Sequence, residues 1–410
     1  MLIRRENRRN HEEFPNGVIG YFVPSVTTGG KCTARGRPDP IKARALNLRK
    51  LNLFNFRNYD QVAIAFEGQV HCLLGKNGSG KTNLLDAIYY LSFTKSSLLS
   101  TDSQNIKTGQ NFFSIKGTFD NDCEILCSFQ LGQKKIMKEN NNDYSRLSEH
   151  IGKYPAVMIA PNDIELIWDG GEVRRRFIDS MISQVNREYL EKLIAYTAHL
   201  KMRNSLLKRF AERGSVDRDL LDSCDTQLIP CGDFIAKTRQ DFLAGFLPFF
   251  QKHYTFLSGS SSESVAIIYR SGTDEYPLAD ALEKNLNRDI ILQRTTMGAH
   301  RDDFLFTLDG FELKRHGSQG QQKSFLIGLK LAEFDVLTAH KKFKPILLLD
   351  DIFDKLDDDR ISRLIGLVGS GTFGQLFISD ARPDRSSELL NHAGIAAEKF
   401  LVENGTIKKE

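Results

Sequence analysis

The chain has 410 residues, of which 40% are hydrophobic and 26% are charged, as in an ordinary soluble globular protein. No uninterrupted apolar run reaches the about 20 residues that a membrane-spanning helix needs, which excludes a membrane-spanning helix, and we expect a soluble protein without a membrane partner. Residues 1–50 hold 11 Lys and Arg against 4 Asp and Glu, whereas the remainder holds 45 against 48, so a nucleic-acid surface must come from local clusters.

Residues 1–42 form a basic segment without helical or strand periodicity. It contains Arg4-Arg5 and Arg8-Arg9 and several Gly and Pro residues, but no apolar stretch of the kind that a secretory signal requires. Two interpretations remain, a disordered basic arm or an upstream extension from a misassigned start. We favour a tail without an essential function.

Regular patterns begin at Ala45. A strand over Leu46–Leu53 should enter a turn at Phe56–Tyr59, and Val62–Phe66 should form the next strand. Phe112–Phe119 and Glu124–Leu131 predict a hairpin whose turn is Asp120-Asn121-Asp122, and Lys138–Asn142 predicts another hairpin tip.

A complete phosphate-binding motif, G-x-x-x-x-G-K-[ST], lies between an apolar run (Val70–Leu74) and a helical pattern (Asn83–Ile88). Its members are Gly75, Lys76, Asn77, Gly78, Ser79, Gly80, Lys81 and Thr82. Glycines let backbone N–H groups and the helix N-terminus approach anionic oxygens. Lys81 should reach the β- and γ-phosphates and Thr82 should ligate Mg²⁺. The sequence therefore predicts a nucleoside triphosphate site.

The middle of the chain is helical. Apolar residues recur at three- and four-residue intervals from Val173, which predicts a helix to about Arg213. A second helix is expected over Leu220–Tyr254, which Pro230 and Pro248 should kink or divide. We expect residues 161–297 to form a helical arm made of a short antiparallel pair. The alternative is an ordinary helical subdomain packed on the head, and both can be true.

Strand and helix patterns then return. Strands are expected over Val265–Tyr269, Asp303–Leu308, Pro345–Leu349 and Gln375–Ser379, and helices over Gln319–His340 and Asp358–Val368. The head is thus split in sequence into residues 43–160 and 298–410, with the helical segment inserted between them.

The strand Ile346–Leu349 is followed by Asp350 and Asp351. A central parallel strand is apolar throughout, and its carboxyl end faces the ligand. Asp350 should hold Mg²⁺, and Asp351 should orient or deprotonate the attacking water. An apolar strand that ends in a solvated acidic turn is the alternative, which the phosphate-binding motif disfavours.

A serine among small residues, Ser318, opens the helix that precedes this strand, within Gly317–Gln322. Such a helix start can bind an anion, although Ser and Gly are also common at helix starts. This helix start lies shortly before the strand that ends at Asp350, and that position favours the anion-site interpretation.

At this point the chain resembles the bacterial RecF family, from about residue 45 to the C-terminus. Six ordered blocks carry the resemblance: Phe56–Tyr59, Gly75–Asn83, Arg174–Asp179, Gly298–Asp303, Ser318–Gln322 and Leu348–Phe353. The resemblance implies an α/β fold, namely an ABC-type P-loop ATPase head split by a short antiparallel helical arm. In place of the Thr common in such proteins stands Asp380, which leaves the last contact with the γ-phosphate open.

The resemblance also implies a function. It implies ATP and Mg²⁺ as cofactors, ATP-driven homodimerisation on double-stranded DNA and at single-strand/double-strand junctions, and slow, DNA-stimulated hydrolysis in the bacterial cytoplasm. RecR, RecO and RecA would be partners in loading RecA at gaps. The implied ATP-binding residues besides the motif are Asn83, Arg57 and Asn58 in the same subunit, and Ser318, Gln319, Gly320 and Gln321 acting across the dimer.

Three basic clusters are candidates for the DNA surface: Arg174, Arg175 and Arg176; Lys201, Arg203, Lys208 and Arg209; and Lys341, Lys342 and Lys344. For each, a solvated helix face or loop is the alternative, and for the last two it is preferred. The three arginines lie near a helix start, where the macrodipole disfavours positive charge.

Two rival functions remain at this stage. A transporter-energising subunit usually has Gly-Gly in the helix-start motif, whereas Gln319 stands here. A non-catalytic DNA clamp would bind ATP without hydrolysing it.

Overall fold

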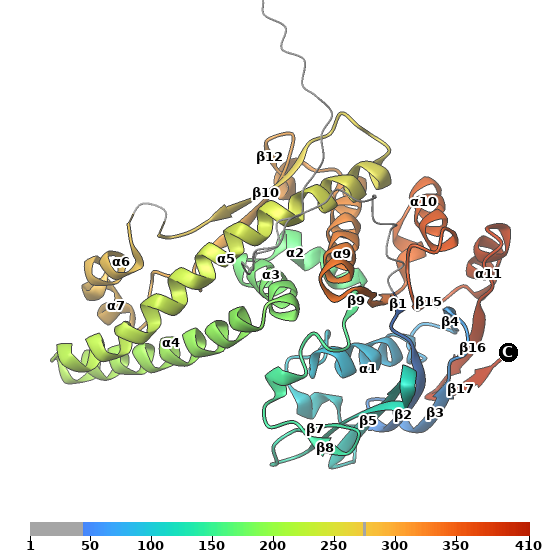
Figure 1. The fold of residues 1–410 in the computed structure, drawn as a ribbon, viewed down its shortest axis with the longest axis horizontal. Coiled ribbons are helices and arrows are strands. Elements are labelled where there is room, and N and C mark those ends of the chain that lie inside the picture. The colour runs from blue at the N-terminus through green and yellow to red at the C-terminus, as the bar shows by residue number, and fades with distance from the viewer. Residues whose placement is uncertain (1–43, 274–275) are drawn as a thin grey trace, which may run out of the picture. The chain divides into compact units, whose positions relative to one another are not determined.

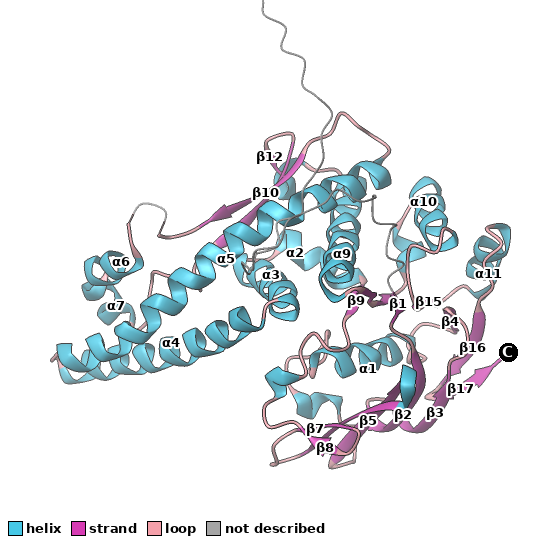
Figure 2. Ribbon diagram, viewed as in Figure 1, coloured by secondary structure: helices cyan, strands magenta, loops and turns pink. Residues whose placement is uncertain are grey.

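The computed structural model describes residues 44–273 and 276–410 (Figure 1). The predicted basic tail, residues 1–42, lies outside the described residues. The fold is of the mixed α/β class that the sequence predicts, with two six-stranded sheets (Figure 2).

The central sheet has the strand order β17-β16-β4-β15-β14-β9. Its strands are β4 (Val70–Leu74), β9 (Ala156–Ile159), β14 (Ile346–Leu349), β15 (Leu376–Asp380), β16 (Glu398–Glu403) and β17 (Thr406–Lys409). All neighbours are parallel except the edge pair β16–β17. Every residue of β4, β9, β14 and β15 is buried, as expected for parallel strands that are covered on both faces.

Alternation along these strands divides the interior into two cores. Leu73, Ile346 and Leu348 pack with helix α1 (Lys81–Phe93) and the second sheet. Their neighbours Leu347 and Leu349 point the other way and pack with α9 (Gln319–Lys341) and α10 (Asp358–Gly369). Successive side chains of a strand point to opposite faces. These apolar strands therefore pack against the layers on both faces of the central sheet.

The second sheet is antiparallel, in the order β3-β2-β5-β6-β7-β8. Its strands are β2 (Leu48–Phe56), β3 (Tyr59–Ala65), β5 (Phe112–Phe119), β6 (Cys123–Gln130), β7 (Ile136–Glu139) and β8 (Asn142–Asp143). Both predicted hairpins are confirmed. The turn between β2 and β3 is made by Arg57 and Asn58.

One buried side chain joins the two sheets at the beginning of β15. The Gln375 Oε1 accepts a hydrogen bond from the Leu48 N–H at 2.6 Å, and its Nε2 donates to the Leu48 carbonyl at 2.9 Å. The amide of Gln375 thus pairs with β2 as another strand's backbone would. We refer to this pair of hydrogen bonds as the Gln375 clamp.

The helical insert differs from the sequence prediction at two points. The first predicted helix is broken, because α3 (Gly171–Val185) ends before Asn186, whose side chain accepts the Tyr189 N–H and begins α4 (Arg187–Arg213). The second, α5 (Arg218–Ser258), runs without a break through Pro230 and Pro248, so a division there is wrong. Each proline removes only one N–H, and α5 is held along its length by α4 and α9 (Figure 1).

A small antiparallel sheet follows the insert, with the order β10-β11-β12. The remaining elements are α2 (Glu165–Trp168), β10 (Val265–Arg270), α6 (Leu278–Lys284), α7 (Leu286–Leu292), β11 (Asp303–Leu308), β12 (Phe311–Glu312), α8 (Leu313–His316), α11 (Pro383–His392) and the pair β1 (Arg44–Ala45) and β13 (Phe343–Lys344). Strand β11 lies beyond the predicted boundary at residue 298, yet Phe304 and Phe306 share a core with α3 and α5. The domain boundaries remain a prediction.

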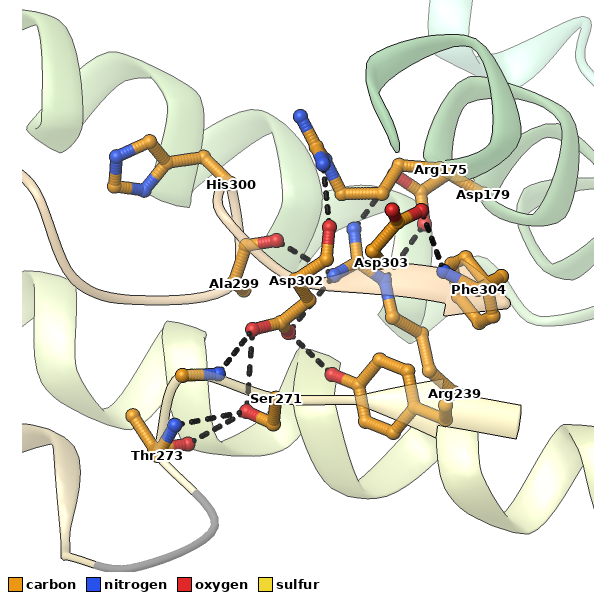
Figure 3. Close-up of polar contacts among 12 residues, drawn as sticks. Arg175, Asp179, Arg239, Ser271, Thr273, Ala299, His300, Asp302, Asp303 and Phe304 are labelled. Atoms are coloured by element: carbon orange, nitrogen blue, oxygen red, sulfur yellow. Dashed lines mark hydrogen bonds and ion pairs between the residues drawn. The ribbon is translucent and has the colours of Figure 1, made fainter. Parts of the chain in front are cut away.

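A buried ionic network anchors the insert (Figure 3). Arg239 of α5, which is 2% exposed, donates to Asp179 of α3 at 2.9 Å, to the Ala299 carbonyl at 2.7 Å and to Asp302 at 3.2 Å. Asp302 also accepts from the Tyr269 hydroxyl. Because these charges are hydrogen-bonded on several sides, their burial is tolerated.

A carboxyl group inside the head carries an unusual charge state. Glu333 of α9 is 5% exposed and lies near the ion pair of Lys330 Nζ with Asp163 Oδ1, 3.1 Å apart. Burial raises the pKa of Glu333 to about 7, although the Lys330 charge opposes this shift. The folded protein therefore binds this proton more tightly than the unfolded chain does.

We expect Glu333→Gln to flatten the pH dependence of stability. The wild type should lose stability as the pH rises from about 4.5 to about 7, because the buried carboxyl must ionise. Relative to the wild type, the variant should therefore be more stable at pH 8 than at pH 5.5, by a few kcal/mol at about 1.36 kcal/mol per pKa unit. Urea unfolding at both pH values measures this, with the exposed Glu283→Gln as the control. An equal offset at both pH values would contradict the prediction.

Candidate functional site

The phosphate loop connects β4 to α1 at the carboxyl edge of the central sheet. Gly75, Gly78 and Gly80 have φ values of 153°, 79° and 119°, which L-residues rarely adopt. A Cβ on Gly75 would lie 2.3 Å from the Val402 carbonyl oxygen, whereas nothing lies within 4 Å of one built on Gly78. The loop is thus tight on its protein side and open at Gly78.

Lys81 is buried and its ammonium group holds the loop in shape. Its Nζ donates to the carbonyls of Gly75 at 2.8 Å and Lys76 at 3.1 Å. The Ser79 hydroxyl is buried and has no hydrogen-bond partner among the described residues. Buried polar groups are normally satisfied, so this orphan hydroxyl and the lysine fit an anionic ligand bound in the loop.

Thr82 and Asp350 meet at the adjacent strand end. The Thr82 hydroxyl donates to Asp350 Oδ1 at 2.9 Å and lies 3.0 Å from Oδ2. Ser379 donates to Asp350 Oδ1 at 2.7 Å. Burial raises the pKa of Asp350, while the hydrogen bonds from Ser379 and Thr82 oppose the shift. A hydroxyl beside a carboxylate at the phosphate loop is a donor set that suits Mg²⁺.

Asp351 follows with a left-handed backbone, φ 44°, which Asp tolerates better than most residues. Its N–H donates to the Ser379 hydroxyl at 2.9 Å. Ser379 therefore contacts both acidic residues, a role that the sequence analysis missed. The available signal was the parallel pairing of β15 with β14, which brings the ends of both strands to the same edge.

Arg57 and Asn58 lie behind the loop and brace it. Asn58 Nδ2 donates to the Ser79 carbonyl at 3.1 Å, and Asn83 Nδ2 donates to Asn58 Oδ1 at 2.7 Å. Arg57 donates to Asn83 Oδ1 at 2.7 Å and to Asp86 Oδ2 at 2.5 Å. The structure brings these predicted residues together, and their contact with a nucleotide stays a prediction.

Asp86 is a second residue that the sequence analysis missed. Besides Arg57, its carboxylate binds the hydroxyls of Ser96 and Ser97 at 2.8 and 2.6 Å. It is fully buried, so it anchors the arginine that supports the loop. In the sequence, Asp86 is one polar residue within a largely apolar helical pattern. Nothing in that pattern distinguishes it as a functional residue.

Ser318 and Gln319 lie at the exposed start of α9. The Ser318 hydroxyl accepts the Gln321 N–H at 3.2 Å, and Gln321 Oε1 accepts the Ser318 N–H at 2.8 Å. This is a capping box, and it fixes the helix start. A Cβ on Gly320 would lie 3.2 Å from Arg360 Nη2, so a larger residue would crowd that side chain.

The basic clusters differ in what their side chains contact. Arg174 makes two 2.9 Å hydrogen bonds with Asp303, and Arg175 donates to the Asp302 carbonyl. Arg176 is 62% exposed and pairs with the exposed Glu172. The DNA contacts of these three arginines stay a prediction, for which Arg176 is the most accessible.

Arg203 is a correction to the sequence analysis. Its side chain is buried between Asp225 and Asp289, at 2.8 and 2.6 Å, so it is not available to DNA. From sequence alone, a basic residue on a helix is expected to be exposed to solvent. The two acidic partners of Arg203 lie far from it along the chain, so the sequence does not indicate the ion pairs.

Asp380, whose role the sequence left open, turns toward the start of α11. It accepts the Arg382 N–H at 2.9 Å and the Ser386 hydroxyl. Its carboxylate is buried and serves this local turn.

Comparison with known proteins identifies related chains. A family model described as the RecF/RecN/SMC N terminal domain matches residues 47–400. The chain is 45% identical over 348 residues to the DNA replication and repair protein RecF of Flavobacterium johnsoniae, covering 84% of this chain and 97% of that protein. It is 43% identical over 364 residues to the protein of the same name from Cytophaga hutchinsonii, covering 88% and 96%.

Solved structures of two other proteins are also similar to this chain. The recombination mediator protein RecF with ATP, of the RecFOR pathway, has a TM-score of 0.81 and 30% identity, covering 90% of this chain and 98% of that chain. The Smc head domain of Pyrococcus furiosus bound to the C-terminal domain of ScpA has a TM-score of 0.51 and 18% identity, covering 89% and 96%. The second likeness concerns the fold alone.

We expect Lys81→Ala to weaken ATP binding by about tenfold or more, because a charge-assisted hydrogen bond contributes about 1.5–3 kcal/mol. Lys50→Ala is the control, since Lys50 is an exposed lysine of β2 outside the phosphate loop. Titration with a fluorescent ATP analogue compares the two, after thermal unfolding shows that both variants are folded. Equal affinities would contradict the assignment of Lys81.

Proposed function

The chain belongs to the RecF family of DNA replication and repair proteins, and from this premise we propose that it is an ATP-dependent DNA-binding protein of recombinational repair. Its place would be the bacterial cytoplasm. No helix in residues 44–273 and 276–410 is long and apolar enough to cross a bilayer. A transporter-energising role has no support from the family.

ATP with Mg²⁺ is the proposed ligand of the phosphate loop. The ATP-bound relative supports this, as do the open face of Gly78, the orphan hydroxyl of Ser79 and the position of Lys81. Thr82 and Asp350 would hold the metal ion, which would offset the charge of the phosphates. Asp351 would orient the water that attacks the γ-phosphate.

ATP-driven homodimerisation is the proposed response to the nucleotide. The observation that carries it is the preformed helix start of α9, at which Ser318 and Gln319 are exposed and the capping box fixes the first turn. A γ-phosphate held by Lys81 of one subunit would meet this helix start of the other, together with Gly320 and Gln321. ATP would then favour the closed dimer through differential affinity.

Double-stranded DNA and junctions with single strands are the proposed substrates. The closed dimer would present basic side chains to the backbone, so binding should depend steeply on salt. Slow hydrolysis, stimulated by DNA, would remove the γ-phosphate bridge and release the DNA. RecR and RecO are proposed partners, supported by the relative in the RecFOR pathway, and RecA is proposed from the family resemblance.

We predict that Ser318→Asp abolishes ATP-dependent dimerisation and leaves nucleotide binding by the monomer intact. Asp is as good an N-cap as Ser, so the helix should survive, while its charge repels the γ-phosphate. Light scattering with ATP and with ADP measures the dimer. The exposed Ser370→Asp, at the end of α10, carries the same charge change and should dimerise as the wild type does. A dimer of Ser318→Asp would refute the bridging role.

Asp351→Asn should separate binding from hydrolysis. Loss of a general base lowers the rate by about 10²–10⁴-fold, while ATP binding is retained, so the variant should accumulate as an ATP-bound dimer. Phosphate release and dimer lifetime are the measurements. Normal turnover in this variant would remove Asp351 from the mechanism, and a wild type that binds ATP without any turnover would favour the rival clamp.

A further inference from the structure

A cavity of about 750 Å³ opens between the head and the helical insert. Its walls come from the end of α1, from α3 and α4, and from the loop that precedes β11, with Arg239 of α5 at its base. The volume is within the range of about 300–1,000 Å³ that is usual for small-ligand pockets. None of the predicted ATP-site residues lines it, so it is a separate feature.

The rim of the cavity is positively charged. Five basic residues line the cavity against two acidic ones, Glu172 and Asp179. The side chains of Lys95 and Arg301 are exposed and have no hydrogen-bond or ion-pair partner within residues 44–273 and 276–410. Arg176 pairs only with the exposed Glu172, and such surface pairs contribute little. Three cations are therefore available to an anion.

The cations also affect each other. Although Lys95 is exposed, partial dehydration beside the cavity and the charges of Arg176 and Lys135 lower the pKa of its ammonium group. Burial lowers the pKa of His300 to about 4, and the charges of Arg301 and Arg175 act in the same direction. His300 is thus neutral at physiological pH, and the positive field comes from Lys95 and the arginines.

The ionic network described above keeps the cavity open. Arg175 points along the cavity wall and is fixed by the Asp302 carbonyl, while Asp302 and Asp179 neutralise Arg239 behind it (Figure 3). His300 is held by the Tyr196 hydroxyl at 2.8 Å and by the Thr295 carbonyl at 3.0 Å. These groups are paired internally, so the charge left for a ligand is that of Lys95, Arg176 and Arg301.

The part of the cavity wall that α4 forms is largely apolar. Leu190, Leu193 and Leu200 of α4 are half-buried there, and Thr197 is exposed among them. A duplex offers only its charged backbone to such a surface and would leave the leucines uncovered. An unpaired nucleotide has both a phosphate and an apolar base face, so it matches the rim and the wall together.

We propose that this cavity binds one unpaired nucleotide of a DNA strand, with its phosphate at Lys95, Arg176 and Arg301 and its base against the leucines of α4. This rests on the proposed function as a DNA-binding protein and adds a site for the single-stranded side of a junction. It also gives the insert a role in recognising DNA, because α3 and α4 form most of the walls.

The test compares a blunt duplex with the same duplex carrying a short single-stranded overhang. Fluorescence anisotropy is measured with a nonhydrolysable ATP analogue. The wild type should prefer the overhang substrate, and an abasic overhang should lose most of that preference. Lys95→Ala/Arg301→Ala should weaken overhang binding about tenfold or more and reduce its salt slope by at most about 1, because a single phosphate is contacted, with blunt-duplex binding nearly unchanged.

Two further variants keep the test independent of folding and of net charge. Thr197→Glu places a carboxylate in the cavity on an exposed helical position that tolerates Glu, and it should lose the overhang preference as well. Lys50→Ala/Lys408→Ala removes two exposed charges away from the cavity and should retain the preference. Thermal unfolding and ATP binding verify that the variants are intact.

The possible outcomes distinguish a failure of the proposed cavity site from a failure of the proposed DNA-binding function. An equal loss on both substrates, no loss in either cavity variant, or a wild type without overhang preference would overturn the site while the DNA-binding function stands. A wild type that binds no DNA with any nucleotide would overturn both. Full binding of the abasic overhang would refute the role of the apolar wall and with it the proposed occupant.

Discussion

The parallel pairing of three strands that are far apart in sequence is the constraint on which the nucleotide site depends. Strand β15 lies between β4 and β14, with Ile378 opposite Leu349 and Asp380 opposite Leu74. This register brings Thr82 to Asp350, although 268 residues separate them in the chain. A slip of one residue would turn the side chains of a strand to the other face, so the apolar packing that fixes the register also fixes the donor set.

The insert also depends on contacts between segments that are distant in sequence, but there the contacts are ion pairs rather than apolar packing. Arg239, Asp179 and Asp302 come from three separate segments, and the buried charges of Arg239 and Asp302 are compensated by these ion pairs. Removing Arg239 would take away the cation that pairs with the buried Asp302, and breaking a buried pair in this way costs about 3–5 kcal/mol. Helix α5 continues from this network to its contact with α9, whose first turn holds Ser318. The insert is therefore in direct contact with the helix that is proposed to meet the partner's nucleotide.

Local sequence rules were sufficient where the deciding interactions are local. The glycine spacing predicts the phosphate loop, the apolar run predicts β14, and Ser318 with Gln321 forms its capping box within one turn. The rules failed where a distant partner decides. Arg203 is buried because Asp289 lies beside it, Ser379 reaches Asp350 only through strand pairing, and α5 continues through Pro230 because α4 and α9 support it. Sequence separation, rather than weak propensity, limited the prediction.

The Gln375 clamp has a mechanical consequence for the head. It joins β2 to the central sheet at the amino end of β15, whereas Thr82 and Asp350 meet at the carboxyl end, about 13 Å away at 3.3 Å per residue. The antiparallel sheet has a second attachment at that other end, because Asn58 and Tyr59 donate to the Ser79 and Gly80 carbonyls of the phosphate loop. Two attachments so far apart oppose a rotation of one sheet against the other, so a triphosphate would bind to a loop whose support is already fixed.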